Sequence, residues 1–393
     1  HAEAVTHRQR IRGMLVGSLI GDALGGPLEF APAVKTRQVM PDARGWDETR
    51  LVDDAVRREL ARSIKMFGYA ELRPETAAYG PWRAAAPAGT LTDDSRHKIV
   101  LMRALQKMVV ENGDRLTEQD LARQFVGFQP DPTQTATGHL AELLDEGLRE
   151  YRYASRWVLG ERDSQAAFPP QRLWAGIPNC SGQMTLIPLA GLFPGDPDSA
   201  YRETYRLDFI DAPLARDIAA ALNAGLAAAL DPGLDAGSAS DRWAALFAAM
   251  RQTDPHRIAD VPFAGRPLNR WLDLADSIVD RCGGRPAEAY RLLESEGDPV
   301  YFWDAHFTML VPMTLLKLCR YDGLAAMHLT LDFGHDTDSY AQVLGAMVGA
   351  VDGKDVFPVQ MRDNVDAALR RDYRESIDDW MNTISAATTI YRD

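Results

Sequence analysis

Two stretches of the sequence place hydroxyl and carboxylate side chains directly before an apolar run with helical spacing. The first is GTLTDDSRHKIVLMRAL, from Gly89 to Leu105, and the second is GHDTDSYAQVLGAMVGA, from Gly334 to Ala350. Such residues are favoured at helix starts, where they accept hydrogen bonds from free N–H groups and meet the positive end of the helix dipole. Each stretch alone therefore predicts a capped helix, whereas the two together indicate one oxygen-rich site.

The chemistry offered by these stretches is that of a hard cation. Mg²⁺ and Mn²⁺ bind carboxylates, hydroxyls and water, whereas softer metals favour thiolate or imidazole. Carboxylates crowded together without cations repel one another and acquire raised pKa values, a cost that bound metal removes. Two Mg²⁺ ions, with Mn²⁺ as the alternative, fit best the oxygen-bearing residues Thr92, Asp93, Asp94, Asp336, Asp338 and Ser339.

A third stretch, GDALGGPLEF, adds two acids near the start of the chain. Asp22 lies inside an apolar helical pattern, where a buried carboxylate must be paired, hydrogen-bonded or close to a metal. It is either a helix-terminal contact or a support for the metal ligands. Glu29 follows Pro27 in a predicted loop and is either a solvated surface residue or an acid or base at a cleft.

The elements that must position these residues are predicted to be helices. Apolar residues recur at helical spacing along most of the chain, for example over 52–64 and 214–230, and strict strand-like alternation is hard to find. We predict an all-α protein, with the Pro/Gly-rich segments 71–90 and 192–201 as ordered loops. Further helices are predicted over 93–111, 138–151, 239–251, 268–281, 303–320 and 374–390.

Two of these helices carry glycine at every fourth position. The first helix has Gly13, Gly17, Gly21 and Gly25, and the last motif helix has Gly345, Gly349 and Gly353. Each interior glycine costs about 0.8–1 kcal/mol relative to alanine. Residues four apart share a helix face, so a stripe of glycines suits a helix that another backbone approaches closely. We predict that both helices are central and tightly crossed.

Composition excludes several classes of protein. The chain has 393 residues, 46% hydrophobic and 25% charged, with a formal net charge of −13 and no basic stripe, which argues against bulk nucleic-acid binding. No segment is long and apolar enough to predict a membrane span. The three cysteines are far apart and are expected to be buried free thiols. We expect one domain over 1–393 and a monomer; the N-terminus lacks methionine, so the compartment is left open.

The sequence resembles the ADP-ribosylglycohydrolases. The stretches GMLVGSLIGDALGGPLEF, GTLTDDS and GHDTDSYAQVLGAMVGA, in that order, look like the signature blocks of that family. A middle segment, NCSGQMTLIPLAGL, is similar to the family's small-residue loop bordering the ADP-ribose pocket, and DAPLARDIAAALNAGLAAAL resembles the helix that follows it. The resemblance spans roughly residues 11–353.

The resemblance implies a compact orthogonal helical bundle that holds a binuclear Mg²⁺ centre. It implies hydrolysis of the N- or O-glycosidic bond between ADP-ribose and an acceptor, which is a side chain of an ADP-ribosylated protein or a small molecule. Loop N–H groups or a helix N-terminus would hold the diphosphate. By position, the catalytic residues would be Glu29, Asp94 and Asp336. The ADP-ribose side would be lined by Gly182, Gln183 and Met184, and the metal ligands would be Thr92, Asp93, Asp94, Asp336, Asp338 and Ser339.

This sequence departs from the family pattern at the pocket. His335 stands where the family commonly has glycine, and we expect it to form part of the pocket wall. Ser339 replaces threonine and keeps the hydroxyl, and Thr185 replaces an arginine. Two alternatives stay open: a glycosidase for another nucleoside or nucleotide sugar, and a non-catalytic ADP-ribose binder. The predicted loops 71–90 and 152–178 contain four candidates for an aromatic side chain that stacks on adenine: Tyr79, Trp82, Trp157 and Trp174.

Overall fold

The computed structural model describes residues 5–29, 49–64, 87–128 and 139–392, with side chains from 148 onward in the last range. The described chain is helical, and its strand-like pairing is confined to one isolated bridge between Asn179 and Asp304. The predicted all-α class is confirmed. The main helices are α1 (His7–Gly25), α3 (Asp54–Ser63), α5 (Asp93–Ala104), α6 (Glu118–Gly127), α7 (His139–Val158), α8 (Ser181–Thr185), α9 (Pro197–Leu207), α10 (Pro213–Ala229), α11 (Ala239–Gln252), α12 (Pro267–Arg281), α13 (Pro286–Glu296), α14 (Ala305–Leu318), α15 (Gly323–Phe333), α16 (Thr337–Asp352), α17 (Val359–Tyr373) and α18 (Ile377–Arg392).

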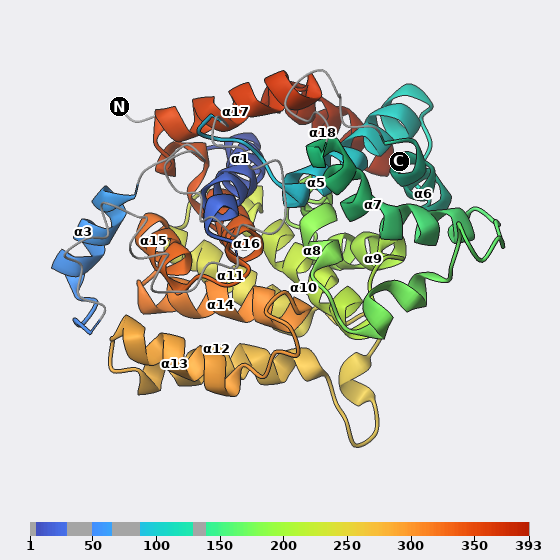
Figure 1. The fold of residues 1–393 in the computed structure, drawn as a ribbon. Helices are drawn as coiled ribbons and strands as arrows, with labels where there is room; N and C mark the ends of the chain where they lie inside the picture. Colours follow the sequence, from blue (N-terminus) through green and yellow to red (C-terminus); the bar gives the residue numbers. More distant parts are fainter. Residues whose placement is uncertain (1–4, 30–48, 65–86, 129–138, 393) are drawn as a thin grey trace.

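The first helix and the third helix from the end form the centre of the bundle. In Figure 1, α1 and α16 lie side by side in the middle, α14 and α15 pack beside α16, and α17 covers one end. From Gly13 to Gly25, every residue of α1 is buried, and so is every residue of α16 from Thr337 to Val351. A helix buried on all sides is expected to read as apolar all round, and both sequences do.

The glycine stripes are the contact surface between α1 and α16, as predicted. A methyl group added at Gly13 would lie 2.5 Å from the carbonyl oxygen of Gly349, and one added at Gly17 would strike the carbonyl of Gly345. Going along α1, the neighbours run backwards along α16, and a methyl group on Gly25 would lie 2.5 Å from Cα of Asp338. The helices are therefore antiparallel, and the C-terminal end of α1 meets the N-terminal end of α16.

Several predicted boundaries are wrong in detail. The segment 152–178 is not a continuous loop, because α7 continues to Val158 and a short 3₁₀ segment covers Pro170–Gly176. The segment 192–201 is half helical, since Asp196 caps α9 by accepting from the N–H of Ser199. Proline and glycine mark the bends there correctly, but a capping acid before Pro197 starts a new helix. The predicted loop 71–90, with Tyr79 and Trp82, lies mostly outside the described residues.

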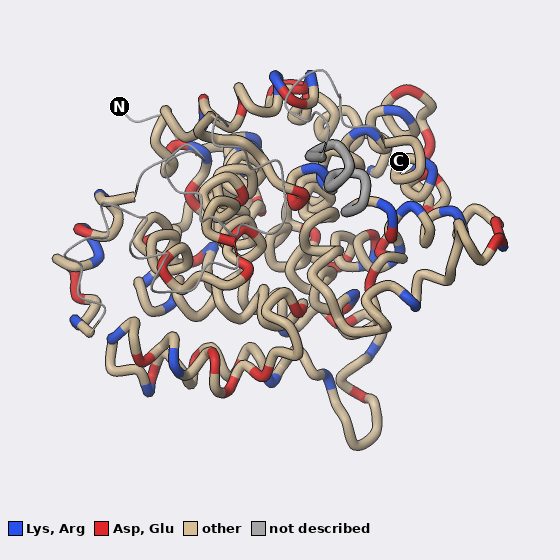
Figure 2. The backbone as a smooth tube through the Cα atoms, viewed as in Figure 1, with Lys and Arg blue, Asp and Glu red and all other residues tan. Residues whose placement is uncertain are grey.

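Other expectations can be compared with the described chain. The three cysteines are free and buried, as predicted. Figure 2 shows Lys and Arg interspersed with Asp and Glu along the described backbone, without a continuous basic stripe. Among the described helices, none combines the length and the apolar character needed to cross a bilayer. The single-domain organisation and the monomeric state stay predictions.

Candidate metal centre and active site

The first motif starts α5, and its threonine has two roles. Thr92 is the N-cap in an extended conformation, and its hydroxyl accepts a hydrogen bond from the N–H of Asp94 at 3.1 Å. The same hydroxyl donates to Asp22 and also lies 3.0 Å from Oδ2 of Asp338. The capped-helix interpretation is thus correct for Thr92, and it does not exclude the site.

The second motif starts α16 but does not cap it. Asp336 occupies the N-cap position, yet its side chain makes no capping hydrogen bond. Gly334 and His335, directly before it, both have positive φ angles, 84° and 59°. This left-handed turn, uncommon for a residue other than glycine, turns the chain sharply from α15 into α16. Helix capping therefore does not explain why an acid stands at position 336.

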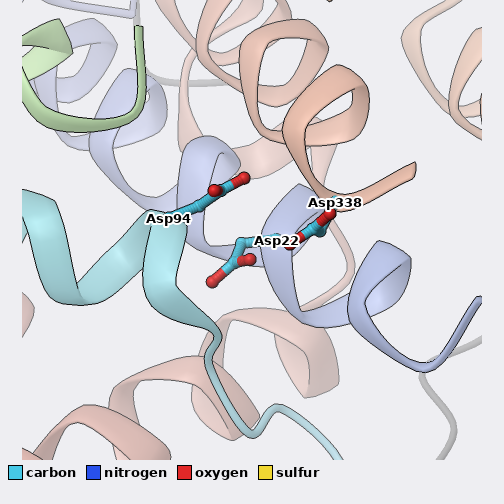
Figure 3. A group of neighbouring side chains, drawn as sticks. All are labelled: Asp22, Asp94 and Asp338. Atoms are coloured by element: carbon cyan, nitrogen blue, oxygen red, sulfur yellow. The ribbon is translucent and has the colours of Figure 1, made fainter. Parts of the chain in front are cut away.

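Asp22 links the two motifs. Its carboxylate is fully buried and accepts hydrogen bonds from the N–H of Thr92 at 2.8 Å and from the hydroxyl of Ser95 at 2.5 Å. Figure 3 shows Asp22, Asp94 and Asp338 converging from α1, α5 and α16. Asp22 is therefore part of the acidic cluster, and the glycine contacts between α1 and α16 are what bring it there.

Two overlapping groups of carboxylates could hold metal ions. Asp22, Asp94 and Asp338 form one, and Glu29, Asp336 and Asp338 form the other, and in each group the ligand atoms lie within 4.8 Å of one another. All five side chains are buried. Asp338 belongs to both groups. Asp93 is half-buried and faces the adjoining cavity with Asp94, Asp336 and Ser339.

The hydrogen-bonding state of these carboxylates fits a cation. Buried polar atoms are almost always hydrogen-bonded, yet Oδ1 and Oδ2 of Asp94, Oδ1 of Asp338 and Oε2 of Glu29 have no partner among the described residues. Unpaired buried oxygens that come together from different elements could ligate a cation. Together with the purely oxygen donor set, they fit a hard divalent cation.

Burial and mutual repulsion make the carboxylates reluctant to ionise without metal. Burial, followed by the charge of Asp338, raises the pKa of Glu29 and of Asp94 well above the usual range. Burial, followed by the charge of Asp336, does the same for Asp338. Burial and the neighbouring charge of Asp94 raise the pKa of Asp336 to about 8. A metal-free site would therefore hold protons where the loaded site holds cations.

The raised pKa values predict a pH dependence of stability. A carboxyl group with a raised pKa in the folded state stabilises the fold at low pH, and this contribution is lost as pH rises through the folded pKa. For Asp336 that window extends from about 4 to about 8. In EDTA, the melting temperature should fall between pH 5 and pH 8. The stabilisation by Mg²⁺ should be larger at pH 8, because cations then displace fewer protons than at pH 5. Equal Mg²⁺ effects at both pH values in differential scanning fluorimetry would contradict this prediction.

A cavity of about 140 Å³ opens over the acidic cluster. Its walls combine acids with aromatic and small residues: Glu29, Asp93, Asp94, Tyr151, Trp174, Asn179, Cys180, Met184, Trp303, Asp336 and Ser339. A larger groove, of about 690 Å³, lies between the end of α5 and α18 and contains none of these acids. The smaller cavity is therefore the candidate active site.

Aromatic rings form one side of this cavity. Trp303 stacks on Tyr301 with ring centroids 4.6 Å apart and lies 6.3 Å from Trp174. Trp174 is 42% exposed and sits in a left-handed turn with a φ of 54°. An exposed aromatic in a strained backbone at a cavity mouth is suited to contacting a ligand. Of the aromatic candidates named from the sequence, Trp174 lines the cavity and Trp157 does not.

The three substrate residues predicted from the middle loop do not behave alike. Met184 lines the cavity. The side chain of Gln183 instead donates to the carbonyl of Ala305 at 2.8 Å, at the start of α14. The N–H of Gly182 is bonded to Oδ2 of Asp211 at 2.9 Å. This amide therefore already has a carboxyl oxygen as its acceptor, and it is not available to a diphosphate in this conformation.

His335 lies beside the site without lining the cavity. Its ring stacks on Phe302 with centroids 3.7 Å apart, and its Nε2 lies 3.0 Å from Oε1 of Glu294. The hydroxyl of Tyr340 donates to the carbonyl of Phe302, which ties the same segment to α16. In this conformation the imidazole packs the turn before Asp336 and is not exposed to the cavity.

Sequence reasoning did not single out several residues around the site. Trp303 and Tyr151 lie within predicted helices and carry no motif of their own. The hydroxyl of Tyr151 lies 2.8 Å from the hydroxyl of Ser181, which in turn donates to Asn179 at 2.8 Å. Asn179 and Cys180 are the first two residues of the family-like middle segment, which was their signal. Trp303 had no local signal.

These features define an all-helical protein with a buried carboxylate centre beneath a small, partly aromatic cavity. The ADP-ribosylglycohydrolase family model matches residues 3–389, so the chain belongs to the ADP-ribosylglycohydrolase family and is a hydrolase of that type. A solved structure described as an "ADP-ribosylglycohydrolase-related protein complex" is similar, with a TM-score of 0.51, 17% identity and coverage of 98% of each chain. At that identity the likeness supports the fold alone. No curated protein matches the sequence significantly.

Proposed function

We propose that this protein is a Mg²⁺-dependent hydrolase that cleaves the glycosidic bond between ADP-ribose and an acceptor, either a protein side chain or a small molecule. The observation that carries the proposal is the pair of carboxylate groups that share Asp338, of whose other members Glu29, Asp94 and Asp336 line the cavity. Family membership supplies the reaction class, and the acidic pair supplies the place for two divalent cations. Mn²⁺ is expected to substitute for Mg²⁺.

The site residues divide the work of holding cations and substrate. The metal would be held by the carboxylates of Asp22, Asp94, Asp336 and Asp338. The hydroxyl groups of Thr92 and Ser339 would supply further oxygen ligands beside them. Bound divalent cations would orient ribose hydroxyls and lower the pKa of a water molecule at the anomeric carbon. Asp93 faces the cavity from the first turn of α5.

Glu29 is the candidate acid–base residue. It lines the cavity, and its Oε2 has no hydrogen-bond partner in the described chain. From this position its carboxyl group can exchange a proton with the leaving group or with water as the glycosidic bond breaks. The nearby carboxylates of Asp336 and Asp338 would stabilise the positive charge that develops on the ribose ring.

The cavity size indicates which part of the substrate enters. Its 140 Å³ lies below the 300–1,000 Å³ of sites that enclose drug-sized ligands. We propose that the reacting ribose enters this space and that Trp174 and Trp303 contact a planar group at the mouth. The remainder of the ADP-ribose unit would extend beyond the described cavity walls.

A second candidate function is favoured by one observation. Among the described residues that line the cavity there is no Lys or Arg, whereas a diphosphate carries negative charge. A cavity without basic side chains suits an uncharged nucleoside better than a diphosphate, which favours a nucleoside glycosidase. A non-catalytic ADP-ribose binder is the third reading, but it gives no reason for the complete carboxylate set with Glu29.

The discriminating experiment is turnover of a substrate panel. ADP-ribosyl-arginine, ADP-ribosyl-serine and a set of nucleosides would each be incubated with the protein in EDTA, Mg²⁺ or Mn²⁺, and released ADP-ribose or free base quantified. We expect release from an ADP-ribosyl conjugate only with metal. Turnover confined to nucleosides would establish the second candidate, and binding of ADP-ribose without turnover the third.

A further inference from the structure

Three consecutive basic residues are buried directly behind the acidic cluster. Arg96, His97 and Lys98 follow Asp94 on α5, with exposed fractions of 4%, 1% and 0%. Basic side chains are almost never fully buried unless they are paired. His97 lies 3.1 Å from the hydroxyl of Thr185 and needs no charge, because burial lowers its pKa to about 4. Arg96 and Lys98 therefore need an explanation.

Lys98 has polar neighbours that do not balance its charge. Its Nζ donates to Oε1 of Gln342 at 2.6 Å and to the backbone carbonyl of Asp94 at 3.3 Å. Gln342 is itself held by Ser18 and by the carbonyl of Gln183. Lys98 forms no direct ion pair in the described chain. The carboxylates that act on it electrostatically are those of the cluster, first Asp94 and then Asp22.

Arg96 is placed similarly on another face of α5. It hydrogen-bonds Tyr373, and its Nε and Nη1 have no acceptor among the described residues. Asp93 and Asp22 are the carboxylates that act on its charge. Both basic groups thus lie near the cluster without hydrogen-bonding to its carboxylates. The unpaired oxygens of those carboxylates are available as ligands for cations.

The charges of this assembly balance only when all its parts are counted. Six carboxylates surround the site: Asp22, Glu29, Asp93, Asp94, Asp336 and Asp338. Two divalent cations would neutralise four of them, and a buried guanidinium and ammonium would neutralise the remaining two. A buried charge is costly without a partner, so a neutral assembly is the stable one.

We infer that Lys98 and Arg96 are built-in counter-charges of the metal centre, which complete its neutralisation when two divalent cations are bound and also weaken the binding of those cations. The inference rests on the proposed function, since it requires the two-cation site. It follows from Coulomb's law, because fixed positive charges in a poorly polarisable interior repel a cation over several ångströms. The two basic residues thus lower the affinity for the cations and stabilise the fold when the cations are absent.

The test is the Mn²⁺ affinity of charge-removing variants, measured by calorimetry and accompanied by melting temperatures in EDTA. Lys98→Met keeps the length of the side chain and removes its charge. We expect Mn²⁺ to bind at least about tenfold more tightly, which corresponds to about 1.4 kcal/mol. In EDTA the variant should melt at a lower temperature than the parent, because the carboxylates lose a counter-charge. Arg96→Met should change both quantities in the same directions.

Arg242→Met is the matched control. Arg242 is also buried, but it pairs with Asp235 and donates to two backbone carbonyls. Its charge acts on Arg10, which lies on α1 three helical turns before Asp22 and therefore away from the carboxylate cluster. Its loss should lower the melting temperature and leave the Mn²⁺ affinity unchanged. Unchanged or weaker Mn²⁺ binding in folded Lys98→Met overturns the inference, and if that variant does not fold, Arg96→Met decides in the same way. Absence of Mn²⁺ binding by the parent protein would instead overturn the proposed function.

Discussion

Asparagine in place of Asp338 should abolish metal-dependent hydrolysis while leaving the helical fold intact. Asp338 belongs to both carboxylate groups, so its loss removes a ligand from each proposed cation. We expect turnover to fall about 1,000-fold or more, which corresponds to about 4 kcal/mol of lost transition-state stabilisation. In EDTA the variant should be at least as stable as the parent, since a buried repelling carboxylate becomes neutral.

The control for this variant is Asp372→Asn. Asp372 is also buried, at the end of α17, but its carboxylate accepts hydrogen bonds from Arg371 and belongs to neither carboxylate group. Its replacement should leave turnover within about threefold of the parent. Metal-dependent turnover by Asp338→Asn at the parental rate would refute the assignment of the centre.

Valine in place of Gly345 should prevent folding or destabilise the protein by more than about 4 kcal/mol, a range reached only by severe core disruption. The added Cβ would strike the carbonyl group of Gly17 on α1. Both obstructing atoms belong to the backbone of a buried helix, so no side-chain rotation can relieve the clash. The helices would have to separate, which would also draw Asp22 away from Asp338. Circular dichroism and thermal melting measure the effect.

Gly127→Ala provides the comparison. Gly127 ends α6, its φ is not positive, and a methyl group there meets nothing within 4 Å. This change should alter stability by no more than about 1 kcal/mol, in the stabilising direction, because alanine has less conformational freedom to lose. A Gly345→Val variant as stable as the Gly127→Ala variant would show that the α1–α16 contact is not close in solution.

The overall design of the site was predictable because backbone features encode it. Glycines at every fourth position leave one face of a helix without side chains, so that another backbone can approach it. Gly17 and Gly345 therefore predicted a close crossing, which the structure contains. The crossing in turn brings together two motifs about 240 residues apart. The oxygen-rich residues at the two helix starts predicted their shared environment. Asp22, for which two roles were left open, lies in one of the carboxylate groups.

Several contacts around the site depend on partners that no local pattern records. Gln183 points away from the cavity because the carbonyl of Ala305, which is 122 residues later, accepts its hydrogen bond. His335 stacks on Phe302, a partner that sequence spacing does not reveal. The N–H of Gly182 is occupied by Asp211, from the loop before α10. The predicted helix ended at 151 although neither proline nor glycine stands there, whereas α7 continues to Val158 and Gly160, with a φ of 99°, follows its end.

The buried basic residues illustrate the same limit from the opposite side. A run of Arg96, His97 and Lys98 after a helix start is usually solvated in a soluble protein, because charged residues are mostly exposed. Here α5 is enclosed by other elements, and all three are buried. Their environment follows from packing around the centre of the bundle. The sequence carries no separate signal for it.

The most direct test of the account is a crystal structure of the protein soaked in Mn²⁺, with anomalous scattering used to locate the ions. We predict two anomalous peaks on either side of the carboxylate of Asp338, one within ligand distance of Asp94 and the other within ligand distance of Asp336. A structure whose peaks lie elsewhere, or which has none at Asp338, would contradict the claim that α1, α5 and α16 assemble a two-cation centre.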